Sequence, residues 1–365
     1  MDMLIQEFRE NRILWLLVVV PVVLVLEHTS ADAHTLLFVL SVLAIVPLAA
    51  LLSRATENVA TRTGDAVGGL LNATLGNLTE LVIAVTALRA GMIDLVKASL
   101  AGAIMTNSLF MLGMSLLLGG LRHHTQEYNR VTARLQAGML FLAAVALLVP
   151  SAIASSEHAG VAAITLQLSV GLSVLLLFAY VLGLYFSLWT HREVFSSAAH
   201  HGAEGERPWP LPVAGVVLAV VTILVALVSE IFVASVQAAA EAFGMTPAFV
   251  GFIIVSIVGG AAEMVAAFSA ARKDRLDLSV GIALGSSSQI ALFVAPVLVL
   301  LSLLIAPVPL DLQFWPGAVV AVMISTIAVT LVTNSGRSGW YVGVLLLVLY
   351  ATFAITLYLL PPATR

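Results

Sequence analysis

Two stretches of this sequence match each other without gaps. Residues 76–110 read GNLTELVIAVTALRAGMIDLVKASLAGAIMTNSLF, and residues 259–293 read GGAAEMVAAFSAARKDRLDLSVGIALGSSSQIALF. Each copy carries one glutamate, Glu80 or Glu263, four residues after a glycine, and each ends in Leu-Phe. Membrane helices share a small alphabet, but charged residues and glycines that match at one offset favour an internal repeat over chance.

The composition indicates an all-α, polytopic membrane protein. Of the 365 residues, 61% are hydrophobic and 10% are charged, whereas a soluble domain carries about 25% charged residues. Apolar runs of about 20 residues recur along the chain, and each is long enough to cross a bilayer as a helix. The net charge of −4 gives no reason to expect a nucleic acid as partner.

The hydropathy pattern predicts eleven transmembrane helices. They cover residues 12–27, 34–53, 60–89, 94–119, 131–153, 160–188, 211–238, 246–271, 277–304, 314–333 and 340–360. If the N-terminus lies inside, all of the 16 Lys and Arg residues except Arg89, Lys97 and Arg365 fall on the inner side. This is the positive-inside bias of membrane proteins, and it supports the predicted number of spans.

The offset of the repeat carries predicted spans 2–6 onto spans 7–11. Because five is an odd number, the second copy must be upside down relative to the first. We therefore predict an extra N-terminal transmembrane helix in residues 1–30, a first five-helix repeat in 34–188, a cytoplasmic linker in 189–209 and a second, inverted five-helix repeat in 210–361. Inverted repeats are typical of secondary transporters, whose site lies near the midplane between the repeats.

Glu80 and Glu263 are the candidate site residues, because each lies about midway along a predicted span. A charge at mid-membrane costs roughly 2.5–3.5 kcal/mol on insertion scales. The alternative for a single glutamate is a protonated side chain that bonds a neighbouring helix, but two at equivalent positions favour a shared site. Ca²⁺ or two protons would neutralise such a pair equally well, which would favour exchange of one for the other, and the two carboxyl groups would titrate as a coupled pair.

Further oxygen donors stand near these glutamates in the sequence. Glycines one helical turn before each glutamate can break the helix and turn carbonyls toward a cavity, or can simply allow close helix packing. Oxygen atoms suit a hard cation such as Ca²⁺, and the sequence has no cysteine and no histidine in a span centre. The predicted metal ligands are Glu80, Glu263, Gly76, Asn77, Gly259, Gly260, Asn107, Ser286 and Gln289.

Both motifs resemble the Ca²⁺/cation antiporter superfamily and, within it, the cation/proton exchanger (CAX) family. The resemblance implies a Ca²⁺/H⁺ antiporter in which Glu230, Glu57 and Asp65 lie along a proton or cation access path. The second motif departs from the family, because Gly260 and Met264 stand where Asn and His are usual. These two departures leave the cation selectivity open.

Several alternatives remain at this stage. A Na⁺- or K⁺-linked exchanger, or an exchanger of another divalent cation, is the nearest rival, and a cation channel is a more distant one. No HExxH pair or Ser/His arrangement indicates an enzyme, and no cofactor is expected beyond the transported Ca²⁺ and H⁺. We expect a prokaryotic cytoplasmic membrane as the location, and a homo-oligomer is possible.

Overall fold

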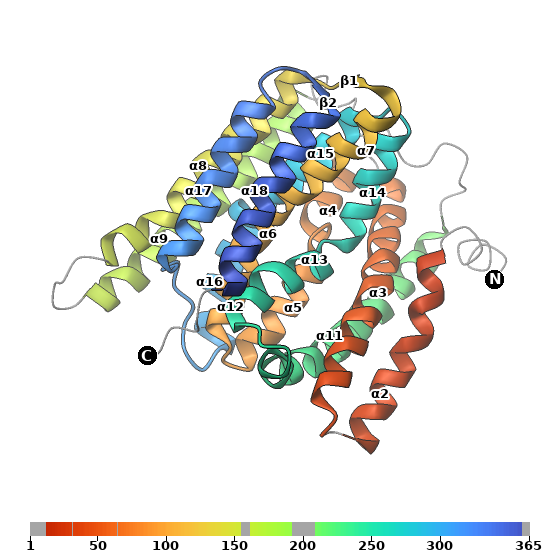
Figure 1. The fold of residues 1–365 in the computed structure, drawn as a ribbon, viewed down its shortest axis with the longest axis vertical. Coiled ribbons are helices and arrows are strands. Elements are labelled where there is room, and N and C mark those ends of the chain that lie inside the picture. Colours follow the sequence, from red (N-terminus) through yellow and green to blue (C-terminus); the bar gives the residue numbers. More distant parts are fainter. Residues whose placement is uncertain (1–11, 31, 64, 155–160, 192–208, 360–365) are drawn as a thin grey trace.

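The protein is a bundle of long helices with one small two-stranded sheet (Figure 1). The computed structural model describes residues 12–30, 32–63, 65–154, 161–191 and 209–359. The linker predicted at 189–209 therefore lies almost wholly outside the described residues, as do the ends of the chain.

The elements follow one another along the chain as a series of helical rods, several of them broken or widened by a π-turn. They are η1 (Arg12–Val18), α2 (Val19–Thr29), α3 (His34–Arg62), α4 (Asp65–Leu75), α5 (Leu78–Arg89), α6 (Ile93–Met105), η2 (Thr106–Met111), α7 (Leu112–His123), β1 (Thr125–Glu127), α8 (Arg130–Ala154), α9 (Val161–Tyr185), η3 (Phe186–Thr190), α11 (Leu211–Ala242), α12 (Pro247–Phe249), η4 (Val250–Val255), α13 (Ser256–Gly259), α14 (Ala261–Arg272), α15 (Leu276–Gln289), η5 (Ile290–Val294), α16 (Ala295–Ile305), α17 (Pro316–Val332), β2 (Arg337–Gly339) and α18 (Trp340–Leu359).

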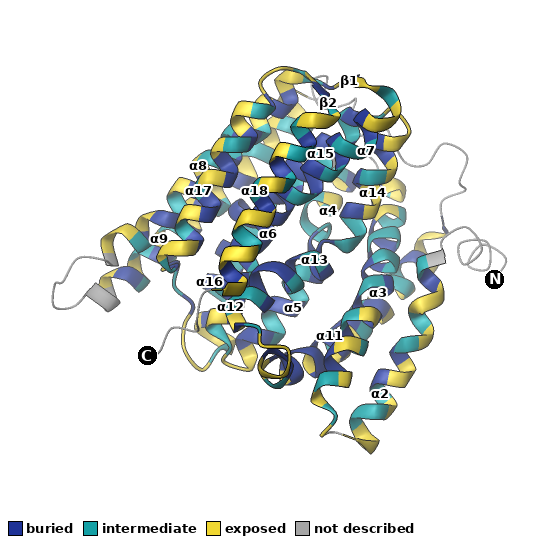
Figure 2. Ribbon diagram, in the orientation of Figure 1, coloured by how far each residue is buried: buried dark blue, intermediate teal, exposed yellow. Residues whose placement is uncertain are grey.

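The helices are built to cross a membrane. In the described residues seven helices are long and apolar enough to span one, or nine if two bent pairs each count as one span. Two shorter apolar helices, Ile13–Thr29 and Pro316–Val332, stand where the first and tenth spans are predicted, so the structure is compatible with eleven spans. Large apolar side chains are exposed along α9, α11 and α18 (Figure 2), as expected for surfaces that face lipid.

The two halves of the chain repeat the same series of elements. Helix α5 (Leu78–Arg89) has its equivalent in α14 (Ala261–Arg272) at the offset that relates Glu80 to Glu263. The π-turns η2 and η5 likewise interrupt equivalent helices, α6–α7 and α15–α16. The broken helix pair α4–α5 corresponds to α12–α14. The predicted architecture of two inverted repeats is therefore present in the fold.

Helices α3 and α11 pack against each other in opposite directions. Phe38, near the start of α3, stacks on Phe232 of α11 with ring centroids 5.3 Å apart. At the other end, the Nε of Arg62 donates to the Trp209 carbonyl just before α11, at 3.2 Å. This antiparallel pair holds the first repeat against the second over the length of both helices.

Two local features go beyond what the hydropathy pattern predicts. Helix α3 continues to Arg62, nine residues beyond the predicted end at residue 53, because Arg54 to Arg62 contain no glycine or proline and continue the helix beyond the apolar run. The polar link after α7 forms strand β1, which pairs antiparallel with β2 from the other half.

Candidate functional site

The two candidate glutamates lie at equivalent breaks in two membrane helices. The axis bends by 43° between Val67–Leu75 and Leu78–Arg89, and by 60° between Pro247–Gly259 and Ala261–Arg272. The predicted breaks are therefore present. After each break the new helix begins with the glutamate in its first turn, where free N–H groups and the helix dipole favour negative charge.

Several oxygen atoms around these breaks are buried and have no hydrogen-bond partner within the described residues. They are both carboxyl oxygens of Glu80, Oε2 of Glu263 and Oδ1 of Asn107. Glu80 and Glu263 are close enough to interact electrostatically. Buried polar atoms almost always have partners, so a group of four without one is what a site for a cation, protons or water requires.

Four polar side chains form a hydrogen-bonded chain between the two halves. The Nδ2 of Asn77 donates to Oε1 of Gln289 at 2.6 Å, and the Oγ of Ser286 donates to Oδ1 of Asn77 at 3.0 Å. The Nδ2 of Asn107 then donates to the Ser286 hydroxyl at 2.9 Å. Because Asn107 uses its amide N–H in this chain, its free Oδ1 is left as an acceptor at the end.

The predicted glycines lie against these side chains, but not symmetrically. A Cβ on Gly259 would lie 2.9 Å from Cγ of Glu80, so the Glu80 side chain lies on the bare backbone of Gly259. A Cβ on the equivalent Gly76 would face Oε1 of Gln289 at 3.8 Å instead. At Gly260 it would lie 3.4 Å from the free Oδ1 of Asn107. None of these three glycines has a positive φ, so close approach is the physical reason for them.

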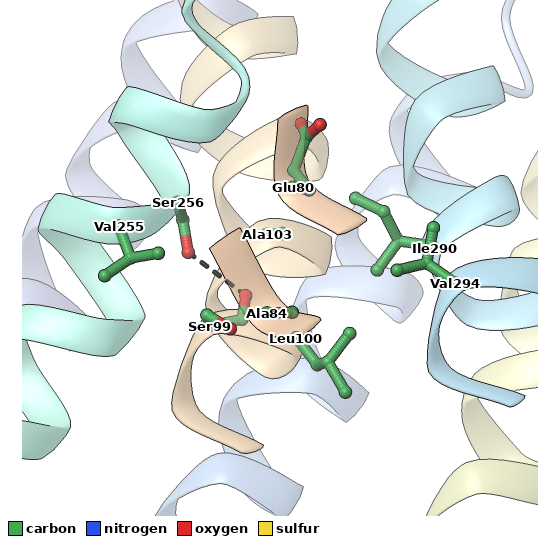
Figure 3. Close-up of a pocket in the computed structure, with 9 residues that line it drawn as sticks. All are labelled: Glu80, Ala84, Ser99, Leu100, Ala103, Val255, Ser256, Ile290 and Val294. Atoms are coloured by element: carbon green, nitrogen blue, oxygen red, sulfur yellow. Dashed lines mark hydrogen bonds between the residues drawn. The ribbon is translucent and has the colours of Figure 1, made fainter. Parts of the chain in front are cut away.

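A small cavity of about 20 Å³ adjoins Glu80 (Figure 3). It is lined mainly by apolar side chains, together with Ser99 and Ser256, and the Ser256 hydroxyl donates to the Ser99 carbonyl at 3.2 Å. Sequence reasoning missed these two serines. The position of Ser256 one turn before Gly259 was the available signal, whereas nothing in the sequence placed Ser99 beside Glu80.

None of the three residues predicted for access paths is among the buried oxygens without a partner that the structure describes. Glu57 is an exposed residue 3.8 Å from Arg54, and it is close enough to Glu263 to interact electrostatically. Asp65 begins α4, and its side chain lies outside the described residues. Glu230 lies 4.0 Å from Arg89 in a separate cavity of about 550 Å³ between α5 and α11.

The oxygen atoms of this arrangement suit a hard cation that is bound by only two carboxylates and by neutral oxygens. Among the described residues, no three His, Cys, Asp or Glu side chains gather to hold a metal ion. The two carboxyl groups and the amide oxygen of Asn107 are the donors without a partner among the described residues, and Ca²⁺ accepts both types. Of the predicted polar ligands, Asn77 and Gln289 use their contacting oxygens within the chain of hydrogen bonds, while Asn107 keeps one free.

Comparison with known proteins places the chain among cation exchangers. The sodium/calcium exchanger protein family matches residues 33–189 and 213–359. The Ca(2+)/H(+) antiporter of Synechocystis sp. is 40% identical over 350 residues, which cover 92% of this chain and 94% of that protein. The Ca(2+)/H(+) antiporter ChaA of Bacillus subtilis is 40% identical over 354 residues, with coverage of 96% and 100%.

The fold agrees with these matches. The crystal structure of the Ca2+/H+ antiporter protein YfkE superimposes with a TM-score of 0.82 at 36% identity, covering 96% of this chain and all of that one. The matches of the family to both halves and the long, high-identity relatives establish a common origin. The chain is a member of the sodium/calcium exchanger protein family.

Proposed function

We propose that the protein exchanges Ca²⁺ for H⁺ across a membrane, with Glu80 and Glu263 as the carboxyl groups that the two ions share. The group of buried oxygens without partners around these glutamates carries the proposal. The relatives that match over nearly the whole chain are named Ca(2+)/H(+) antiporters, and we assign the same ions to this transporter. We assign it no enzymatic activity and no cofactor.

The pair of carboxylates links the two ions through charge. When Ca²⁺ is bound, two carboxylates cancel its charge, and when it leaves, two protons cancel theirs. An empty site with both carboxylates ionised would leave uncompensated charge in a low-dielectric region, which is strongly unfavourable. The protein therefore changes access while it is loaded with one ion or the other, and this produces exchange rather than leakage.

Neutral donors complete the site. Oδ1 of Asn107 is a buried acceptor without a partner, so it is the neutral side chain best placed to join the carboxylates. The chain of hydrogen bonds through Ser286, Asn77 and Gln289 holds the Asn107 amide in this orientation. Asn77, Ser286 and Gln289 thereby act mainly as positioning residues in this conformation, and the breaks at Gly76 and Gly259 supply carbonyls.

Access and orientation follow from the arrangement of the charges. The basic residues favour a cytoplasmic N-terminus in a prokaryotic cell membrane. In that orientation Glu57 and Asp65 lie on the cytoplasmic approach to the site, and Glu230 lies on the external one. The chain would then comprise an N-terminal helix in 1–30, repeats in 34–188 and 210–361, and a cytoplasmic linker in 189–209.

Transport by the purified protein in proteoliposomes tests the proposal. With an outward proton gradient imposed, ⁴⁵Ca²⁺ uptake and lumenal pH are followed together. We expect Ca²⁺ uptake coupled to proton efflux in the parent, and loss of both in Glu80→Gln and Glu263→Gln. Glu241→Gln, which changes an exposed carboxylate near the end of α11, should transport as the parent does.

The same preparation discriminates the rival functions. Uptake that ignores the proton gradient but follows a Na⁺ or K⁺ gradient would assign the protein to monovalent-linked exchange. Conductance without coupled proton movement would indicate a channel. Retention of coupled exchange by both glutamine variants would refute the two-carboxylate site.

A further inference from the structure

Six exposed basic residues lie in or beside the segments around β1 and β2, and Figure 1 shows this end of the molecule. Short contacts link the segments that carry them. The His123 ring lies 3.2 Å from the Arg272 carbonyl, and Glu127 is opposite Arg337 in the sheet register. Arg130 donates to Oδ1 of Asn334 at 3.2 Å. We call this surface the basic end, and its members are Arg122, Arg130, Arg134, Arg272, Lys273 and Arg337.

The basic end carries more positive than negative charge. None of its six members forms an ion pair with an acidic side chain of the described residues. At the opposite end of the molecule, by contrast, Arg89 pairs with Glu230 and Lys97 pairs with Asp311. The arginine and the lysine at that other end thus each have an acidic partner, whereas no ion pair is found among the described residues of the basic end.

The nearby acids are engaged elsewhere. Oδ1 of Asp274 accepts from the Gln126 amide at 2.8 Å, and Oδ1 of Asp277 accepts from the Asn129 backbone N–H at 2.9 Å. These bonds hold the turn between α14 and α15 against the β1 segment. These two acids therefore bond to neutral donors and keep their charge, and Glu127 lies opposite Arg337 in the sheet. The six basic residues outnumber these three nearby acids.

Exposed apolar side chains adjoin the basic end. On α8, Val131 and Leu135 are exposed beside Arg130 and Arg134, and the exposed apolar face continues along the helix to Leu142. Exposed apolar faces of a membrane protein lie against acyl chains, so cations at their ends reach the headgroup region.

Neighbouring helices repeat this arrangement. Leu121 is 61% exposed beside Arg122 at the end of α7. Two exposed aromatic residues, Trp340 and Tyr341, follow Arg337 at the start of α18. Aromatic side chains of this kind mark the membrane interface.

We propose that the basic end binds the headgroups of anionic phospholipids. Guanidinium groups form paired hydrogen bonds with phosphate oxygens, and each basic residue near an anionic membrane surface contributes about 1 kcal/mol of attraction. The positive-inside bias explains why these residues are on one side. It does not explain why they lack acidic partners and cluster at the ends of lipid-facing stripes, and bound anionic lipid accounts for both.

Lipid binding by the purified full-length protein in detergent tests this inference without reference to transport. The probe is acyl-labelled fluorescent phosphatidylglycerol, with acyl-labelled phosphatidylcholine as the neutral control. We expect the protein to bind the anionic lipid more tightly, in a salt-sensitive manner. The triple variant R272Q/K273Q/R337Q should weaken that binding about tenfold or more, since three contributions are removed, and leave the binding of phosphatidylcholine unchanged.

Two matched variants separate charge from folding. R272K/R337K keeps the charges and should retain most of the affinity, while Arg89→Gln removes one cation at the opposite end and should bind as the parent does. If the triple variant does not purify as a folded protein, Arg337→Gln alone should give a partial loss. Inorganic phosphate at the lipid concentration should not compete. Equal binding of the two lipids, or unchanged binding by the glutamine variants, would overturn the inference.

Discussion

At the scale of single residues, the site depends on glycines, because the missing side chain lets other groups lie directly against the backbone. Glu80 and Glu263 occupy equivalent positions in the first turns of α5 and α14, yet their surroundings differ. The Glu80 side chain lies on Gly259, whereas the nearest side-chain atom above Gly76 belongs to Gln289. The two repeats also differ in sequence here, since Asn77 corresponds to Gly260 and Gln289 to Thr106 at the offset of the repeat.

Gly259→Ala tests the contact between this glycine and Glu80. The new methyl carbon would lie 2.9 Å from Cγ of Glu80, so the carboxyl group must move away from the site. Overpacking of this kind costs roughly 1–3 kcal/mol, and a cost of about 1.4 kcal/mol borne by the Ca²⁺-bound state would weaken apparent affinity tenfold. The half-saturating Ca²⁺ concentration in proteoliposome uptake measures the effect.

Gly281→Ala is the matched control, because a Cβ at Gly281 in α15 would meet nothing within 4 Å. Alanine also favours the helix at such a position by about 1 kcal/mol. This variant should transport with parental affinity. If Gly259→Ala bound Ca²⁺ as tightly as Gly281→Ala does, the contact between Glu80 and Gly259 would not contribute to Ca²⁺ binding.

The sequence was informative about which residues belong together, but not about their bonds. Matching copies identified both glutamates, and the polar residues Asn77, Ser286 and Gln289 do lie in one hydrogen-bonded chain. The direction of that chain, which leaves Oδ1 of Asn107 free, depends on side-chain rotamers set by packing. The difference in packing around the two glutamates likewise depends on side-chain positions that the matching of the two stretches does not give.

At the scale of elements, breaks and small residues let the central helices approach closely. Glycines within the apolar spans predicted the breaks before α5 and α14, because a helix loses stability where glycine replaces a larger residue. The length of α3 could not be predicted in this way, since hydropathy records where a membrane ends and not where a helix ends. The pairing of β1 with β2 joins three-residue segments, too short to show any alternation of polar and apolar residues.

Gly102→Ala tests the closest approach between the central helices of the two halves. A Cβ at Gly102 in α6 would lie 2.2 Å from the Phe252 carbonyl oxygen in η4 and 2.5 Å from Phe252 Cα. Backbone atoms cannot move aside as a side-chain end can, so α6 and η4 must separate. We expect a stability loss of about 1–3 kcal/mol, measured as a lower midpoint of thermal unfolding in detergent.

Gly138→Ala provides the comparison for this packing prediction. Gly138 lies in α8 and has no atom within 4 Å of the added Cβ, so its unfolding midpoint should equal or exceed that of the parent. If Gly102→Ala unfolded at the same temperature as Gly138→Ala, the close crossing of α6 and η4 would not contribute to stability.

At the scale of the whole molecule, the two inverted halves bring one carboxyl group each to a common centre. The hydrogen bonds between Asn77, Ser286 and Asn107 all cross from one half to the other. A movement of one half against the other must therefore change the surroundings of both glutamates together. This is the physical basis on which binding of an ion and change of access can be linked.

That linkage predicts how pH acts on Ca²⁺ binding by the intact protein. If protons and Ca²⁺ share the oxygens of Glu80 and Glu263, as we propose, Ca²⁺ should bind most tightly at alkaline pH and more weakly as pH falls. Where both carboxyl groups must lose a proton before Ca²⁺ binds, the logarithm of the apparent dissociation constant should change by about two per pH unit. Isothermal titration of the purified protein with Ca²⁺ across the pH range measures this slope.

The glutamine variants turn this slope into a test of the shared site. With one carboxyl group removed, as in Glu80→Gln, any remaining Ca²⁺ binding should depend on pH with a slope no greater than about one, because only one proton is displaced. The number of protons released per Ca²⁺ bound, measured in weakly buffered solution, should likewise fall from about two in the parent to about one in the variant. If the Ca²⁺ affinity of the parent protein did not change with pH, Ca²⁺ and protons would occupy separate groups. Exchange would then need another explanation, in which a conformational change rather than competition for one site links the two ions.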